Sequence, residues 1–277
     1  MTLQPTAPAV VPLSSGHAVQ NVVFICEFAS TLASQDLDAI QALYNSNNDL
    51  KSLLPIQQVH RGATFTINAA DGNINPQPAD GNPIGLTYLR MAANGQPEWQ
   101  VSIDSNRVLI VCGSYTRWLP VFQSVTQFFA LFLGAINERI IASAALQYTD
   151  WFEVFPGEGN SIASAIFDPD NDYLNKVVKS ALEPWHTHLG WFETRQDSPR
   201  ILVNLNINTV PAANLGFWRV SLTHMQKVNF TTQVNLSDFS QVVKPLFEDL
   251  HHLNKEMLNQ ILKDEVCNMI SLNNSPG

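Results

Sequence analysis

The sequence contains little cysteine. Its three cysteines, Cys26, Cys112 and Cys267, are far apart and odd in number, so any disulfide would leave one thiol over. None of them has another Cys or a His at the spacing typical of a zinc site. Cys26 and Cys112 lie in apolar runs typical of strands, where cysteine behaves as a small buried hydrophobic residue. The cysteines therefore predict a reducing compartment and a cytoplasmic location.

Charged side chains are also scarce. They make up 14% of the 277 residues, whereas a typical soluble domain has roughly 25%, and 25 Asn and 17 Gln supply polarity instead. The net charge is −9 and no basic patch in the sequence offsets it, which argues against nucleic acid and against an anionic membrane as partners. Hydrophobic residues make up 45%, which excludes a disordered protein.

No hydrophobic run in the sequence is long enough for a membrane-spanning helix. The longest candidate, residues 128–136, has about half of the roughly 20 residues that a span requires. Apolar residues recur at steps of three and four from Trp118 to Ile136, which predicts a buried amphipathic helix that begins near Pro120. Residues 1–20 are proline-containing and have no basic segment, so we expect a flexible arm rather than a signal peptide or anchor.

Periodicity and turn residues predict a similar order of elements in the two halves of the chain. In the first half we expect a strand over 21–28, a helix capped by Ser34 or Asp36, strands over 59–68, 84–91, 99–103 and 107–113 with a turn-rich loop over 69–82, and the helix over 118–136. In the second half we expect a strand over 139–148, a loop over 156–169, a short helix over 171–182, strands over 186–194, 200–209 and 217–230, and a long helix over 237–270.

This order predicts an α+β protein made of two similar units. Each unit would run strand, helix, several strands and long helix, with an antiparallel sheet packed on its long helix. The units would cover residues 21–137 and 138–277, after the arm of residues 1–20. The alternative is one continuous sheet, and hence one domain, that spans both halves.

Three segments carry a resemblance to a bacterial family. The first is VLIVCGSYTRWLPVFQSVTQFFALFL, an apolar strand followed by Tyr115 and by Trp118 near the start of a helix; the others are AALQYTDWF and LFEDLHHLNKEMLNQIL. On these segments the chain resembles a sporadically distributed, functionally uncharacterised bacterial family. It departs from the family at Gln147, where Arg is usual, and at Thr149-Asp150, where Ile-Asn is usual. The resemblance implies the fold and a bacterial-type origin, and it supplies no activity.

Two histidines in WHTHLGWFE form a candidate metal site. His186 and His188 are two residues apart, which places both on one face of a strand, and two histidines at this spacing can bind a metal. Glu193 falls on the opposite face, and no third ligand is evident nearby in the sequence. We therefore expect two exposed strand residues rather than a metal site.

Two acidic clusters also resemble metal sites. Glu248, His252 and Glu256 are spaced four apart, but they lie opposite an apolar helical stripe and are expected on the solvent face. That stripe consists of Leu246, Leu250, Leu253, Met257 and Ile261.

The second acidic cluster is the run Asp168, Asp170 and Asp172. It lacks the Gly and Glu of a calcium loop. We expect it to end a loop and to cap the helix over 171–182, and weak cation binding stays open.

Aromatic residues are the main candidates for a binding surface, because Tyr and Trp are favoured interface anchors. They gather at 115–118 and 148–155, where we expect connections between elements. The alternative is that they fill the core. The candidate binding residues are Tyr115, Trp118, Tyr148, Trp151 and Phe155, together with His186 and His188.

The sequence contains none of the familiar nucleotide-binding, hydrolase or metalloprotease motifs. We therefore expect a non-catalytic protein-interaction module of a bacterial type, in a conflict or defence setting, with no catalytic residues, metal or cofactor. The first alternative is a small-ligand-binding protein, because a sheet that grips a helix can enclose a cavity. The second is an enzyme with a site near His186 and His188. A deep polar pocket would favour these alternatives, and a flat apolar patch would favour protein interaction.

Overall fold

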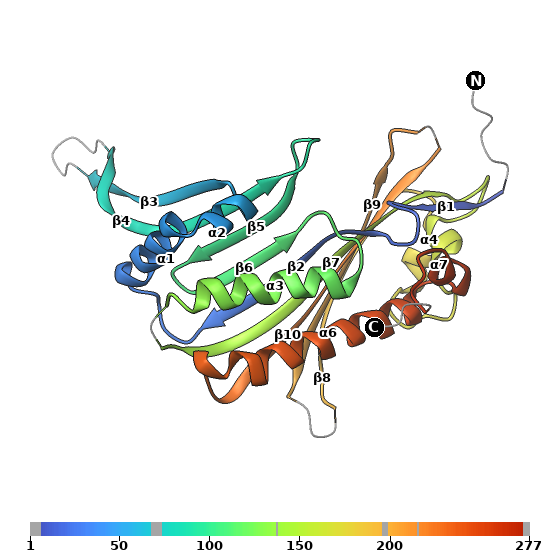
Figure 1. Cartoon of the computed structure of the whole chain (residues 1–277). Helices are drawn as coiled ribbons and strands as arrows, with labels where there is room; N and C mark the ends of the chain where they lie inside the picture. Colours follow the sequence, from blue (N-terminus) through green and yellow to red (C-terminus); the bar gives the residue numbers. More distant parts are fainter. Residues whose placement is uncertain (1–6, 68–73, 137, 196–198, 215, 274–277) are drawn as a thin grey trace.

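Helices pack on one large antiparallel sheet in the computed structural model, which confirms the α+β class (Figure 1). The structure describes residues 7–67, 74–136, 138–195, 199–214 and 216–273. The 10 strands run in the order β3-β4-β5-β6-β2-β7-β10-β9-β8, and β1 pairs with β7 beyond the end of β2. The strands are β1 (Ala9–Pro12), β2 (Val19–Phe28), β3 (Ile56–Ile67), β4 (Ile74–Met91), β5 (Pro97–Asp104), β6 (Arg107–Cys112), β7 (Ile140–Phe155), β8 (His186–Glu193), β9 (Ile201–Pro211) and β10 (Trp218–Asn235).

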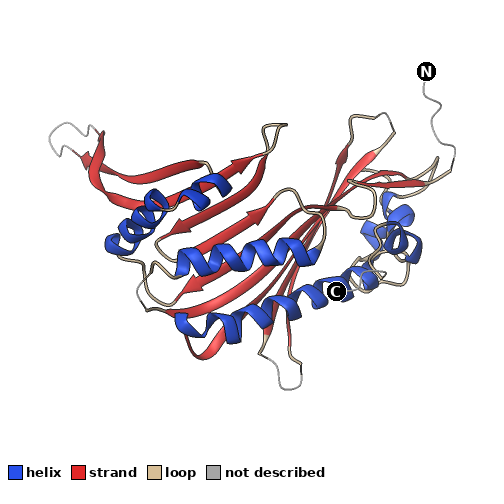
Figure 2. Ribbon diagram, viewed as in Figure 1, coloured by secondary structure: helices blue, strands red, loops and turns tan. Residues whose placement is uncertain are grey.

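The longer helices lie along one face of this sheet, with α3 beside α6 (Figure 2). The short helices α4, α5 and α7 lie near the far end of α6 (Figure 1). The helices are α1 (Ser34–Ser46), α2 (Asn48–Leu53), α3 (Trp118–Leu133), α4 (Ile162–Ile166), α5 (Lys176–Ser180), α6 (Phe239–Ile261) and α7 (Asp264–Met269), with a 3-10 turn at Leu236–Asp238.

The two halves of the chain share this one sheet. Strand β7 pairs with β2 of the first half on one side and with β10 of the second half on the other. The described residues give no evidence of two repeated units, so the alternative of a continuous sheet holds and the expectation of separate sheets is wrong. The cause is the length of β7, which has 16 residues and offers a hydrogen-bonding edge to both neighbours.

The core lies between the sheet and the helices. Helix α3 buries the predicted stripe, and its Phe122 lies 6.3 Å from the ring of Phe24 on β2. Phe247 of α6 lies 5.3 Å from Phe24 and 5.8 Å from Phe129 of α3, so three elements meet at Phe24. Helix α3 is therefore a core helix, and no helix among the described residues combines the length and the hydropathy needed to cross a bilayer.

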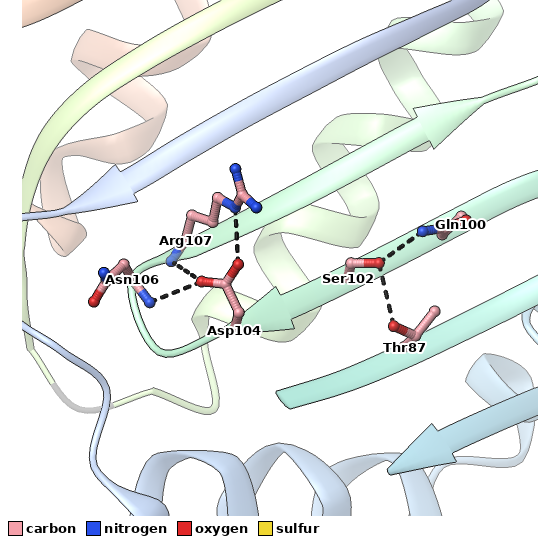
Figure 3. Close-up of polar contacts among 6 residues, drawn as sticks. All are labelled: Thr87, Gln100, Ser102, Asp104, Asn106 and Arg107. Carbon is pink, nitrogen blue, oxygen red and sulfur yellow. Dashed lines mark hydrogen bonds and ion pairs between the residues drawn. The ribbon is translucent and has the colours of Figure 1, made fainter. Parts of the chain in front are cut away.

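The opposite face of the sheet carries polar side chains on β4 and β5 (Figure 3). On β5 the apolar residues alternate with Gln100, Ser102 and Asp104, because successive side chains of a strand point to opposite faces. Gln100 donates to Ser102 Oγ at 2.8 Å, and Ser102 in turn lies 3.3 Å from Thr87 Oγ1 on β4. At the end of the strand Asp104 accepts hydrogen bonds from the backbone and side chain of Arg107, which fixes the turn into β6.

Three segments differ from the sequence-based expectation. They belong to strands that extend beyond the part in which apolar and polar residues alternate. Residues 9–12 of the expected arm form β1, and residues 1–6 lie outside the described residues. Of the expected loop over 69–82, residues 74–82 belong to β4 and 69–73 lie outside the described residues. Strand β7 continues to Phe155, so residues 148–155 are not a connection.

The helices expected over 171–182 and 237–270 are shorter in the structure. Residues 176–180 form α5, and its N-cap is Asn175, which accepts from the backbone of Val178, instead of the predicted aspartates. The long helix ends at Ile261, and Leu262 pairs with Phe167 as an isolated β-bridge before α7 begins. Contact with a distant segment thus overrides the helical pattern at this point.

The three cysteines are free and buried, and burial raises the pKa of Cys26 to about 12 and those of Cys112 and Cys267 to about 11. We expect all three to react slowly with a chromogenic thiol reagent at pH 8 and fully in guanidinium, because the thiolate is the reacting form. Ser30→Cys is the control, since Ser30 is exposed and its new thiol should react at once. Equal rates for the native thiols and this control would contradict the prediction.

Candidate functional site: a cavity between the sheet and two helices

A cavity of about 670 Å³ lies between the sheet, the N-terminal end of α3 and the middle of α6. The chain before β2 and the chain after α7 close its sides. Its walls combine apolar side chains with three histidines, His224 of β10 and His251 and His252 of α6. A few polar groups in an apolar wall are typical of small-ligand sites. The lining residues are His17, Ala18, Val19, Tyr115, Arg117, Trp118, Leu119, Pro120, Tyr148, Asp150, His224, His251, His252, Asn254, Lys255, Leu258, Ile270, Ser271 and Leu272.

A buried hydrogen-bond network forms the floor of the cavity. His224 on β10 is fully buried, and its Nε2 lies 2.8 Å from Oδ2 of Asp150, which is 2% exposed on β7. Its Nδ1 lies 2.6 Å from Oδ1 of Asn254 on α6. The Asn254 amide is oriented by its own Nδ2, which donates to the carbonyl of Leu250 one helical turn earlier. The floor is therefore fixed by one residue from each of three elements.

Asn254 presents its side-chain oxygen to His224. Because Asn254 Nδ2 is a donor to Leu250, its Oδ1 is the acceptor that faces His224. A carboxylate oxygen of Asp150 faces the other ring nitrogen. Both ring nitrogens of His224 are thus engaged by oxygen atoms of the protein.

A second histidine is held beside this floor. Tyr148 pairs with His224 across β7 and β10, and the two rings stack at 5.6 Å. The Tyr148 hydroxyl lies 2.8 Å from Nδ1 of His251 on α6, whose ring lies flat on Trp118 at 4.1 Å. Trp118 is held in turn, since its Nε1 donates to Glu248 at 3.2 Å. Aromatic packing from α3 therefore sets the plane of the His251 ring.

His251 and Tyr148 are both neutral at physiological pH. Burial, with a smaller contribution from the Lys255 charge, lowers the pKa of His251 to about 3, and burial raises the pKa of Tyr148 well above 10. The Tyr148 hydroxyl has no other acceptor among the described residues, so we assign it as the donor to His251 Nδ1. The proton of the neutral imidazole is then on Nε2, where no described residue accepts it. The ring is a hydrogen-bond donor with a fixed orientation.

Two positively charged side chains, Arg117 and Lys255, line the cavity. Arg117 is exposed and donates from Nη1 to the carbonyl of Gly16 at 2.9 Å, which ties the chain before β2 to α3. Gly16 has φ of +90°, a conformation that favours glycine. Lys255 is half-buried on α6, and the described residues place no carboxylate within ion-pair distance of either cation. Burial is also the main cause of the lowered pKa of His17 nearby, which favours its neutral form.

A second hollow of about 1010 Å³ lies near the start of α1 and the turn between β5 and β6. Its charged side chains are already paired: Asp104 with Arg107, and Glu27 with Lys227 at 2.5 Å. The hollow at α3 and α6 is therefore the stronger candidate, because it retains charges without protein partners.

The structure brings together three of the seven candidate residues proposed from the sequence. Tyr115, Trp118 and Tyr148 line the cavity. Trp151 lies apart from it, with Arg219 over its ring at 4.8 Å, and Phe155 packs on Phe217 at 5.5 Å.

The histidine pair of β8 does not belong to the cavity. His186 and His188 are exposed and pair with Asn208 and Asn206 of β9, as expected for one strand face. Among the described residues, no three His, Cys, Asp or Glu side chains are arranged to hold a metal ion.

The acidic clusters have structural partners. His252 and Glu256 are exposed as predicted, but Glu248 is half-buried under Trp118, which corrects its assignment to the solvent face. In the stripe opposite, Leu246 is half-buried and the other four residues are buried.

In the aspartate run, Asp168 Oδ1 accepts from the backbone of Asp170 at 2.7 Å. The amino group of Lys179 donates to the carbonyls of Pro169 and Asn171. A positive charge thus already lies beside this loop.

Sequence reasoning missed the residues of the floor, Asp150, His224 and Asn254, and His251 beside it. A signal for two of them was present. His224 occupies an inward position of β10 between buried Leu222 and Val228, and Asn254 interrupts the apolar stripe of α6. A polar residue at an apolar position is the informative exception, because burial of an unpaired polar group is costly.

No family model, curated protein or solved structure matches the chain. The resemblance to the sporadic bacterial family stays a prediction, and functional conclusions rest on the geometry of the cavity alone.

Proposed function

We propose that the protein binds a small organic molecule in the cavity between the sheet, α3 and α6. The observation that carries this proposal is a space of about 670 Å³ whose floor is built from buried, fully hydrogen-bonded polar groups. Ligand pockets typically have volumes of about 300–1,000 Å³ and a few polar groups in an apolar wall. The deep, partly polar shape favours the ligand-binding alternative over a flat interaction surface.

The floor supports binding rather than proton transfer. Both ring nitrogens of His224 are already hydrogen-bonded within the protein, so neither is available to a substrate. His251 has a pKa of about 3, which makes it a weak base at neutral pH. Both histidines act as fixed hydrogen-bonding groups in this proposal. Interaction with a protein partner, a defence setting, a bacterial origin and a cytoplasmic location stay predictions from the sequence.

The proposal can be tested by fluorescence titration and calorimetry with N-phenyl-1-naphthylamine and its sulfonated analogue 8-anilinonaphthalene-1-sulfonate. We expect at least one probe to bind the native protein saturably, with one site per chain. Leu119→Trp places a larger side chain at the cavity wall, where Leu119 is 52% exposed, and should weaken binding at least fivefold. Val177→Trp is the matched control, because Val177 is 78% exposed and does not line the cavity. Absence of saturable binding, or equal binding by both variants, would refute the proposal.

A further inference from the structure

We infer that the ligand of this cavity is an apolar molecule with a single acidic head group, which Lys255 and Arg117 bind at the rim. The inference rests on the proposed function and specifies the class of ligand. The head group is a carboxylate or a phosphate, since both present oxygen acceptors with negative charge to Lys and Arg.

The first support is the charge of the cavity. Asp150 is the one acidic residue among the described lining, and its Oδ2 is already hydrogen-bonded to His224. Arg117 and Lys255 have no carboxylate partner among the described residues, so two cationic side chains line the site against one acidic one. The whole chain has a net charge of −9. A local excess of positive charge in an acidic protein favours an anion at this site, because field lines focus in a low-dielectric cleft.

The second support is the position of the two cations relative to the apolar wall. Arg117 is exposed and Lys255 half-buried, so both charges lie toward solvent. Leu258 and Ile270, which are 6% exposed, and the ring of Trp118 line the interior. A ligand that satisfies both regions places its apolar body inside and its acidic group outside. A cation would meet repulsion from both charges, and a neutral ligand would gain nothing from them.

The third support is the donor at His251. Its Nε2 proton has no acceptor among the described residues, and Lys255 lies one helical turn further along α6. Residues at positions i and i+4 lie on the same side of a helix, so the two donors can bind the same head group. An acidic group offers oxygen acceptors to both.

The test compares the two fluorescent probes, which differ in the sulfonate. We expect the native protein to bind the sulfonated probe about tenfold more tightly than the neutral one, the effect of one favourable charge contact at a partly buried site. Lys255→Met keeps an unbranched apolar chain, one atom shorter, and removes the charge, so it should remove most of this preference and change binding of the neutral probe little. Lys244→Met is the matched control, because Lys244 is exposed on the same helix and does not line the cavity.

Competition then identifies the head group. Decanoate and decyl phosphate are each titrated against the bound sulfonated probe, with decanol as the uncharged equivalent. Displacement by one or both anions at concentrations at least tenfold below that of decanol supports the inference, and the stronger competitor identifies the head group. Equal displacement by decanol, or a Lys255→Met variant that weakens both probes equally, overturns the inference and leaves ligand binding intact. Failure of both probes to bind the native protein refutes the proposed function itself.

Discussion

Replacement of His224 by alanine is expected to lower the free energy of unfolding by about 2–6 kcal/mol, because two buried side chains lose their hydrogen-bond partner and each such loss costs about 1–3 kcal/mol. Oδ2 of Asp150, a residue that is 2% exposed, would lose its hydrogen-bond partner. Oδ1 of Asn254 would lose its donor as well. Urea unfolding of the native and variant proteins, followed by circular dichroism, measures the difference.

His188→Ala is the matched control, since His188 is exposed on β8 and its loss should cost about 0.5 kcal/mol or less. Asp150→Asn should cost less than His224→Ala, because the amide side chain can still hydrogen-bond to His224 Nε2. A cost for His224→Ala as small as that for His188→Ala would show that the network contributes little to stability.

Truncation of Phe247 to alanine is expected to cost about 3–5 kcal/mol, the range for a buried phenylalanine. Phe247 is fully buried and contacts Phe24 of β2 and Phe129 of α3, so its removal opens a cavity where three elements meet. Phe192→Ala is the matched control. Phe192 is 51% exposed and contacts the guanidinium of Arg200, so its removal should cost about 1 kcal/mol or less. If the two variants unfolded at the same urea concentration, the contacts of Phe247 would not be central to the core.

The local elements were predictable where the apolar period is unbroken. Helix α3 begins at Trp118, as its spacing predicts, because the stripe from Trp118 to Phe132 follows one helical face. The turn between β4 and β5 was also predictable, since Asn94 precedes Gly95, whose φ is +78°. In both cases neighbouring residues in the sequence decide the structure.

Elements that depend on distant partners were not predictable. The period of α6 continues past Ile261, but the backbone of Asp168 donates to Ile261, and Lys263 donates to Ile166, so the helix ends there. The second half of β7 reads as an aromatic-rich connection because its edge partners, β1 and β10, lie at the two ends of the sequence.

The residues of the candidate site divide in the same way, into those that local sequence reveals and those that depend on distant partners. Tyr115 and Trp118 were found from aromatic clustering, which is a local property. His224 and Asn254 form one network although they are 30 residues apart, and His224 and Asp150 are 74 residues apart. Only the register of β7 against β10 and the packing of α6 bring these groups together.

Because β7 lies between β2 and β10 in the sheet, a newly made chain can pair these strands only after β7 has been synthesised. Glu27 of β2 bonds to Ser143 of β7, 116 residues later, and to Lys227 of β10, 200 residues later. Strand β2 therefore leaves the ribosome long before β7 has been synthesised. The edge of β2 that pairs with β7 stays available for wrong pairings until then. Contacts of such long range also slow the search for the native arrangement. We expect the sheet, and with it the cavity, to be completed only after β10 and α6 have been synthesised.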